Sequence, residues 1–156
     1  MKLDKNPERT EELDKLVLAY EEEIELKRPL HPHEVKRNLS EYEKEINRKN
    51  FYIIKEKGKE IGFVTFSPAI NNETKNKYVE ITRFFIAREY RGNGIEQNVE
   101  KQLIPMFRKN GAKWIKQRVE LTNKDEIAAL GSRGYTAMGN PKYELERGWQ
   151  EFKRNI

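Results

Sequence analysis

The stretch from Ile81 to Leu103 reads ITRFFIAREYRGNGIEQNVEKQL. It begins as an apolar run typical of a strand, continues as a turn with two glycines, and ends as an amphipathic helix. Glycines let the backbone turn tightly and present its N–H groups, and a helix carries partial positive charge at its N-terminus. Arg91 adds a full positive charge beside the turn. The stretch therefore predicts a site for phosphate or pyrophosphate, and with it a nucleotide-like cofactor.

Helical and strand patterns alternate on both sides of this stretch. Helical spacing predicts helices over Thr10–Lys27, from Val35 to about Arg48, from Ile95 to the stop at Asn110-Gly111, and over Lys124–Arg133. Strand patterns cover Phe51–Glu56, Glu60–Ser67, Tyr78–Ala87, Trp114–Leu121 and a last pair at Tyr135–Met138 and Lys142–Glu146. The remaining signals are a hairpin turn at Lys57-Gly58, a polar loop over Pro68–Lys77, and a packed C-terminal tail at Trp149 and Phe152. This order predicts an α/β domain with a mixed sheet.

Length and composition restrict the class of protein. The 156 residues predict one domain, spanning 1–156, that is long enough to bury a core. There is no cysteine, which excludes disulfides, thiolate metal sites and cysteine nucleophiles. The net charge of +5 is compatible with an RNA or acidic partner, but lysines and glutamates alternate, which favours a solvated surface over a nucleic-acid surface. No apolar stretch reaches the ~20 residues that span a bilayer, so we expect no membrane association and a cytoplasmic location.

The element order, with the glycine turn after the third strand, resembles the GNAT superfamily of acetyl-CoA-dependent N-acetyltransferases. The resemblance covers about residues 10 to 147. The core motif of that family, Arg/Gln-x-x-Gly-x-Gly/Ala, is similar to Arg91-Gly92-Asn93-Gly94-Ile95 here, but Glu96 stands at its last position. In the family these backbone N–H groups hold the pyrophosphate of coenzyme A, which agrees with the anion site expected from the turn.

A second family signature runs from an asparagine through a short helix containing a tyrosine to a glycine and an aromatic residue. Asn123, Gly134 and Tyr135 match it in register. The helix tyrosine, which protonates the departing thiolate in many members, is replaced by Leu130. Both motifs at this spacing and on the expected elements make the resemblance specific.

The resemblance implies a fold class and an activity. The fold would be α/β (α+β), with a mixed, mostly antiparallel sheet flanked by helices and a splayed central strand pair, Tyr78–Ala87 and Trp114–Leu121. Acetyl-CoA would enter between those strands as cosubstrate, without a metal, and a primary amine would attack its thioester directly. The acceptor amine stays open, and a homodimer is possible because dimers are frequent in the family.

The same resemblance assigns site residues. Those expected at the cofactor are Phe84, Ile86, Arg91, Gly92, Asn93, Gly94, Ile95, Glu96 and Asn123. Ile86 is also a catalytic candidate, because its backbone N–H would stabilise the oxyanion. Glu80 is the second catalytic candidate, since a carboxylate can take the proton of an ammonium group. The alternative for Glu80 is a solvated strand residue paired with a lysine.

Glu96 leaves two outcomes open. With Asn93 as N-cap, Glu96 falls at the third helical position and completes a capping box. Its carboxylate would then satisfy the N–H groups that a phosphate needs, and it would repel a pyrophosphate. Either coenzyme A binds with Glu96 turned outward, or the cofactor site is weakened. The second outcome, together with Leu130, supports an alternative: a catalytically silent GNAT-fold binding module that recognises a protein or RNA partner.

Three further groups carry weaker signals. The acidic run Tyr20–Glu25 ends the first predicted helix and could attract a cationic amine, or it could be a solvated helix face. His31 and His33 flank Pro32 in a predicted loop, and two histidines at this spacing without a third ligand do not predict a metal site. Tyr90 and Tyr135 are expected to pack rather than donate protons.

Overall fold

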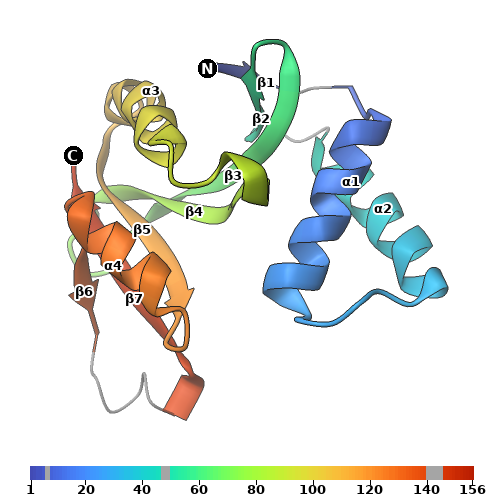
Figure 1. Ribbon diagram of the computed structural model, residues 1–156. Coiled ribbons are helices and arrows are strands. Elements are labelled where there is room, and N and C mark those ends of the chain that lie inside the picture. The colour runs from blue at the N-terminus through green and yellow to red at the C-terminus, as the bar shows by residue number, and fades with distance from the viewer. Residues whose placement is uncertain (6–7, 47–49, 140–145) are drawn as a thin grey trace. The chain divides into compact units, whose positions relative to one another are not determined.

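The computed structural model describes residues 1–5, 8–46, 50–139 and 146–156. Its strands are β1 (Lys2–Lys5), β2 (Phe51–Glu56), β3 (Lys59–Ile70), β4 (Lys77–Ile86), β5 (Ala112–Glu120), β6 (Thr136–Met138) and β7 (Trp149–Asn155). Its helices are α1 (Glu11–Tyr20), α2 (Pro32–Ile46), α3 (Ile95–Lys109) and α4 (Lys124–Ser132), with a π-helix η1 (Glu21–Glu25) and a 3₁₀ turn η2 (Arg88–Tyr90). The strand order is β1-β2-β3-β4-β5-β7-β6 (Figure 1).

The sheet is mixed, as the sequence predicted. The β4–β5 pair is parallel, whereas β1–β2, β2–β3, β5–β7 and β6–β7 are antiparallel. Lys57 and Gly58 both have positive φ, which suits the tight turn between β2 and β3. The expected α/β class, a mostly antiparallel mixed sheet flanked by helices, is therefore confirmed. The β4–β5 register runs from Lys77 to Ile81, and splaying beyond Ile81 stays a prediction.

Both ends of the chain differ from the prediction. Lys2–Lys5 forms β1 against β2, although its polar sequence carries no strand pattern. The expected C-terminal tail is strand β7, which lies between β5 and β6, and Phe152 stands opposite Gln117. Pairing on both sides explains why a segment of mixed polarity is a strand. The strand expected over Lys142–Glu146 falls almost entirely outside the described residues, and Glu146 itself is helical.

Two predicted element boundaries within the chain also differ from those in the structure. The first predicted helix changes to the π form at Glu21 and ends at Glu25 instead of Lys27. Strand β3 continues to Ile70, so the start of the predicted loop is strand. The second predicted helix is described as far as Ile46, and its expected end at Arg48 lies outside the described residues. None of the described helices is long and apolar enough to cross a membrane.

By its internal contacts the chain divides into two compact units. The first consists of Met1–Thr65 with Arg83–Val99, and the second of Phe66–Thr82 with Glu100–Ile156. The prediction of a single domain over 1–156 therefore stays a prediction. In the first unit α1 and α2 lie side by side (Figure 1). Its core contains Leu13, Leu16, Val17, Tyr20, Tyr42, Ile46, Phe51, Ile53, Phe63 and Phe85.

The second unit contains an ion cluster around a buried carboxylate. Glu100, on α3, accepts hydrogen bonds from Arg133 Nε at 3.0 Å and from Arg154 Nη1 at 2.9 Å. Gln117 Nε2 donates to the hydroxyl of Tyr135 at 2.9 Å and lies 3.4 Å from Glu100 Oε1. Because Arg133 follows α4 and Arg154 belongs to β7, one carboxylate joins three elements of this unit.

Candidate functional site

The turn between β4 and α3 has the backbone geometry expected of an anion site. Gly92 and Gly94 have φ angles of 80° and 73°, a region that L side chains rarely adopt. The Gly94 carbonyl accepts the first helical hydrogen bond, from the Asn98 N–H at 3.1 Å. Gly94 is therefore the N-cap of α3, and the N–H groups of the first turn have no partner within the helix. The glycines and Asn93 are exposed, so an anion can reach these donors.

The capping-box prediction for Asn93 and Glu96 was wrong. The Asn93 amide donates to the carbonyl of Tyr90 at 3.3 Å, one residue before the position of the cap. Glu96 is the second helical residue, not the third. The reason is that two glycines with positive φ carry the turn one residue further before the helix begins. Glu96 is half-buried, and it stays the residue that departs from the family motif.

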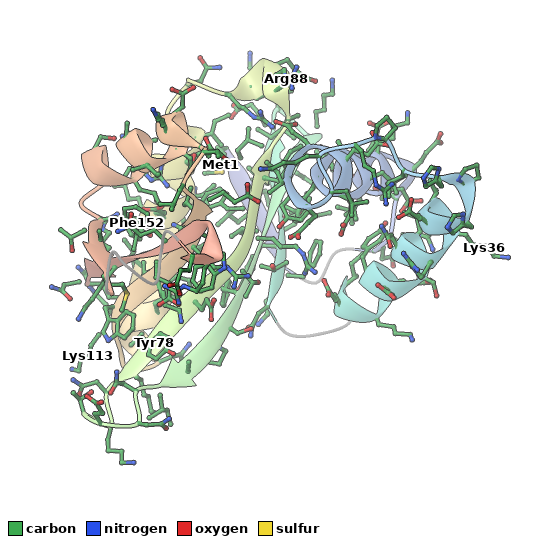
Figure 2. All side chains as sticks on the ribbon, turned by 90° about the horizontal axis from the view of Figure 1, so that it is seen from below. Met1, Lys36, Tyr78, Arg88, Lys113 and Phe152 are labelled. Atoms are coloured by element: carbon green, nitrogen blue, oxygen red, sulfur yellow. The ribbon has the colours of Figure 1, made fainter. Side chains whose placement is uncertain are left out.

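Arg91 is held on three sides. Its Nε donates to the carbonyl of Ile86 at 2.8 Å, and its guanidinium lies 5.3 Å from the ring centre of Phe85. Its terminal nitrogens donate to both carboxylate oxygens of Glu23, at 2.5 and 3.1 Å. Arg88, labelled in Figure 2, lies in η2 with its Nη2 3.9 Å from the same carboxylate. The hydrogen bond from Arg91 lowers the pKa of Glu23, which sequence reasoning had placed only within an acidic run.

Gly62 on β3 positions the end of β4. A Cβ at Gly62 would lie 2.2 Å from the carbonyl oxygen of Phe85 and 3.2 Å from the Cα of Ile86. The β2–β3 register shifts here and leaves Ile61 as an extra residue, whose carbonyl accepts the N–H of Ala87 at 2.8 Å. Sequence reasoning missed this position, although an isolated glycine within a strand pattern signals a close backbone approach.

The other predicted site residues fall in both units. Phe84 is half-buried and Ile86 buried on β4, in the first unit together with the glycine turn. Glu80 belongs to the second unit, and its Oε2 lies 3.8 Å from Nζ of Lys116 on β5. This is the lysine-paired strand arrangement, so its role as a base stays a prediction. Asn123, also in the second unit, caps α4 by accepting the Glu126 N–H at 3.2 Å.

The tyrosines near the motifs are packed. Tyr135 is buried, and burial raises the pKa of its hydroxyl well above the ordinary value. Tyr90 is half-buried, with Lys59 Nζ 5.8 Å from its ring centre. Leu130, at the family's tyrosine position, is fully buried in the second unit. Leu130 has no proton to give a leaving thiolate, and the Tyr135 hydroxyl is buried and bonded to Gln117.

A small cavity of about 40 Å³ lies in the first unit, lined by Val17, Tyr20, Glu21, Asn38, Glu41, Tyr42, Glu45, Phe51, Phe63 and Arg83. Three of these are carboxylates, and Arg83 forms a bidentate pair with Glu45. Burial and the nearby Glu25 raise the pKa of Glu21. Aromatic faces combined with excess negative charge suit a small cation.

Two other carboxylates of the acidic run, and the two histidines, have local partners. Glu22 accepts the backbone N–H of Leu30 at 3.0 Å, and Glu25 accepts the hydroxyl of Tyr20 at 2.6 Å. The rings of His31 and His33 are stacked at 5.7 Å. Within the described ranges, no group of three or more His, Asp or Glu side chains could hold a metal ion.

The sequence over the turn and most of the fold matches a known protein family. The sequence model of the GNAT acetyltransferase family matches residues 16–135, and the chain belongs to that family. An uncharacterized N-acetyltransferase of Methanocaldococcus jannaschii is 27% identical over 107 residues, which are 68% of this chain. The chain spans only 45% of the length of that curated relative.

Solved structures share the fold over the whole chain. The PaiA N-acetyltransferase of Thermoplasma acidophilum, solved in complex with coenzyme A, is 13% identical, with a TM-score of 0.70 and complete coverage of both chains. The ribosomal-protein-alanine N-acetyltransferase of Brucella melitensis is 17% identical, with a TM-score of 0.65 and complete coverage of both chains. At these identities the likeness shows the fold.

Proposed function

We propose that the chain binds acetyl-CoA and transfers its acetyl group to a primary amine, which attacks the thioester directly. The observation that carries this proposal is the exposed turn at Gly92 and Gly94, which leads into the N-terminus of α3 in a chain of the GNAT family. The coenzyme-A complex of the Thermoplasma relative supports the choice of cofactor. A primary amine as acceptor agrees with the N-acetyltransferase relatives.

In this proposal the backbone of the turn supplies the pyrophosphate donors. Gly92–Glu96 contribute backbone N–H groups. Pyrophosphate binding needs little rearrangement of these groups, because the positive φ angles of the two glycines already set the conformation of the turn. Arg91 supplies a full positive charge next to them. Phe84 contributes its backbone to the pantetheine arm. Asn123, the N-cap of α4, is kept as a cofactor-binding candidate.

The chemical step needs positioning, proton removal and stabilisation of the oxyanion. The backbone N–H of Ile86 stabilises the oxyanion, and Gly62 keeps this part of β4 in place. Glu80 takes the proton from the ammonium group, directly or through water. If so, Glu80→Gln lowers the rate of acetyl transfer most at neutral pH. The rate of this variant recovers at high pH, where the amine loses its proton without a base. An unchanged pH–rate profile would leave Glu80 only as the partner of Lys116.

The acceptor is a cationic amine. The aromatic and acidic cavity of the first unit supports this class, because three carboxylates outweigh the charge of Arg83. Its volume is that of a water-sized or ammonium-sized group. A panel of amines and N-terminal peptides, assayed by release of the free thiol of coenzyme A, identifies the acceptor.

Cofactor binding is tested with two glycine variants. Gly94 and Gly148 both have positive φ, and a Cβ at either would meet no atom closer than 3.9 Å, so alanine strains each backbone similarly. Gly94→Ala should lose coenzyme-A affinity in calorimetry, whereas Gly148→Ala, the control, should lose only stability. No heat and no rise in melting temperature for the wild-type protein at millimolar acetyl-CoA would overturn the proposal.

The second candidate is a catalytically silent GNAT-fold binding module. Glu96 at the last motif position and the buried Leu130 favour it. Absence of coenzyme-A binding would select this candidate.

A cytoplasmic location and a homodimer are kept as proposals. Cell fractionation tests the location, and sedimentation equilibrium tests the homodimer.

A further inference from the structure

Arg91 has two contacts besides its pair with Glu23. Its Nε bond to the Ile86 carbonyl and its packing on Phe85 both involve β4, the strand that leads into the turn. These contacts would stay if Glu23 moved away. The two bonds to Glu23 therefore occupy nitrogens that another anion can take.

Glu23 also changes the charge of the turn. Between residues 88 and 96, Arg88 and Arg91 are balanced by Glu89 and Glu96. Glu23 reaches this segment from 68 positions away in the sequence and adds a negative charge to it. A pyrophosphate would therefore meet repulsion from Glu23 and compete with it for the same donor.

Glu23 lies on the π-helix η1, a form that is rare and often found at functional sites. The Leu26 N–H bonds to the Glu21 carbonyl at 2.8 Å in the wide π register. Glu22 and Glu25 bond within the N-terminal segment, to Leu30 and Tyr20. Glu23 instead ties η1 to the turn, so breaking its ion pair would release η1 from that tether.

We propose that Glu23 and the pyrophosphate of coenzyme A are alternative partners of Arg91, so that Glu23 is a latch on the cofactor site. The inference rests on the proposed function, since it names the ligand that displaces Glu23. Cofactor binding opens the Glu23–Arg91 pair and loosens η1. By reciprocity, any ligand that draws Glu23 away from Arg91 raises the affinity for the cofactor.

The first experiment compares the wild-type protein with Glu23→Gln and with Glu22→Gln as the matched control. Glu22 is the neighbouring carboxylate on η1, but it bonds to Leu30 rather than to Arg91. Calorimetry with coenzyme A should show that Glu23→Gln binds roughly tenfold more tightly at low ionic strength and that added salt reduces the gain. Dephospho-coenzyme A should gain as much, because the pyrophosphate is the affected group. Glu22→Gln should change affinity by less than about threefold, since exposed charges further away are screened.

A double-mutant cycle tests whether Glu23 acts through Arg91. In the Arg91→Gln background, Glu23→Gln should raise coenzyme-A affinity less than it does in the wild-type protein, because the competition for Arg91 is gone and only direct repulsion remains. Hydrogen exchange gives a readout that a merely structural pair would not produce. The amides of Glu23–Leu26 should exchange faster when coenzyme A binds the wild-type protein, and those of Glu23→Gln should be fast without ligand and unchanged by it.

The outcomes separate the two proposals. If all variants bind coenzyme A with equal affinity, or if coenzyme A protects η1 from exchange, the latch is wrong and the proposed function stands. If neither the wild-type protein nor Glu23→Gln binds coenzyme A at millimolar concentration, the proposed function fails and the latch fails with it.

Discussion

Two clusters of glutamate and arginine lie in different units and differ in burial. In the second unit, the Glu100 side chain is 1% exposed and that of Arg133 is 4% exposed. In the first unit, Glu23 is 28% exposed and Arg91 is 35% exposed. Both carboxylates accept charge-assisted hydrogen bonds of similar length, so the type of contact does not distinguish them. The two carboxylates differ in their access to water.

This difference decides what each cluster can do. A buried carboxylate that lost its arginines would be left without water to replace them, so the Glu100 cluster holds its partners permanently. An exposed pair exchanges its bonds for water or for another ion at little cost, so the Glu23–Arg91 pair can respond to a ligand. Glu34, a 7% exposed carboxylate paired with the more exposed Arg28, lies between these cases. Three of the following four predictions test this ranking, and one tests backbone packing.

The largest loss of stability is expected for Glu100→Gln. It leaves Arg133 and Arg154 facing a neutral amide in a buried site, which should lower the free energy of unfolding by about 3–5 kcal/mol. Urea denaturation measures it. Arg154→Gln is the milder companion variant, because Arg154 is partly exposed and Arg133 still pairs with the carboxylate. A loss below about 1 kcal/mol for Glu100→Gln would remove the distinction between the two clusters.

The next effect tests backbone packing in each unit. Gly62→Ala should lower the free energy of unfolding by about 1–3 kcal/mol, because its Cβ would overlap the carbonyl of Phe85. It should also slow the proposed acetyl transfer by displacing Ile86. Gly131→Ala on α4 is the matched control, since its Cβ meets nothing within 4 Å and alanine favours a helix. Equal melting temperatures for both variants would contradict the close approach of β3 to β4.

The Glu34–Arg28 pair should make the stability of the protein depend on pH. Hydrogen bonds from Arg28 and from the His31 backbone hold the pKa of Glu34 at about 2, below the ordinary 4.5. A depressed folded-state pKa stabilises the protein above the unfolded value, and this contribution is lost as the pH falls from 4.5 towards 2. Melting temperatures of the wild-type protein and Glu34→Gln should therefore converge over this range. A constant difference between their curves would show that Glu34 is not the titrating group.

The smallest loss of stability is expected for Glu23→Gln. The pair with Arg91 is exposed, so the free energy of unfolding should fall by no more than about 1 kcal/mol. The same variant should show the larger change in coenzyme-A affinity. Urea denaturation without ligand, run beside Glu100→Gln, makes the comparison direct. A destabilisation equal to that of Glu100→Gln would mean that Glu23 is a structural tether instead of a latch.

The local part of the structure could be predicted from the sequence. The glycines at 92 and 94, the apolar periods around them and the asparagine at 123 act over a few residues, so they indicate the turn, the helices and the family directly. The cap of α3 was misplaced by one residue, because asparagine and glycine both suit a turn and only the backbone angles choose between them. Strand β7 was missed because its polar alternation becomes a strand only when β5 and β6 pair with it.

By itself the sequence determined the β4–turn–α3 segment and the family, since hydrogen-bonding patterns within such a segment depend on near neighbours. Only the tertiary structure decided which charges meet. Glu23 and Arg91 are 68 positions apart, and Glu100 and Arg154 are 54 apart. No local pattern distinguishes Glu23 from Glu22 or Arg91 from Arg88 as members of an ion pair. Their partners and their burial follow from how distant elements pack, and burial sets whether a charge pair is permanent or exchangeable.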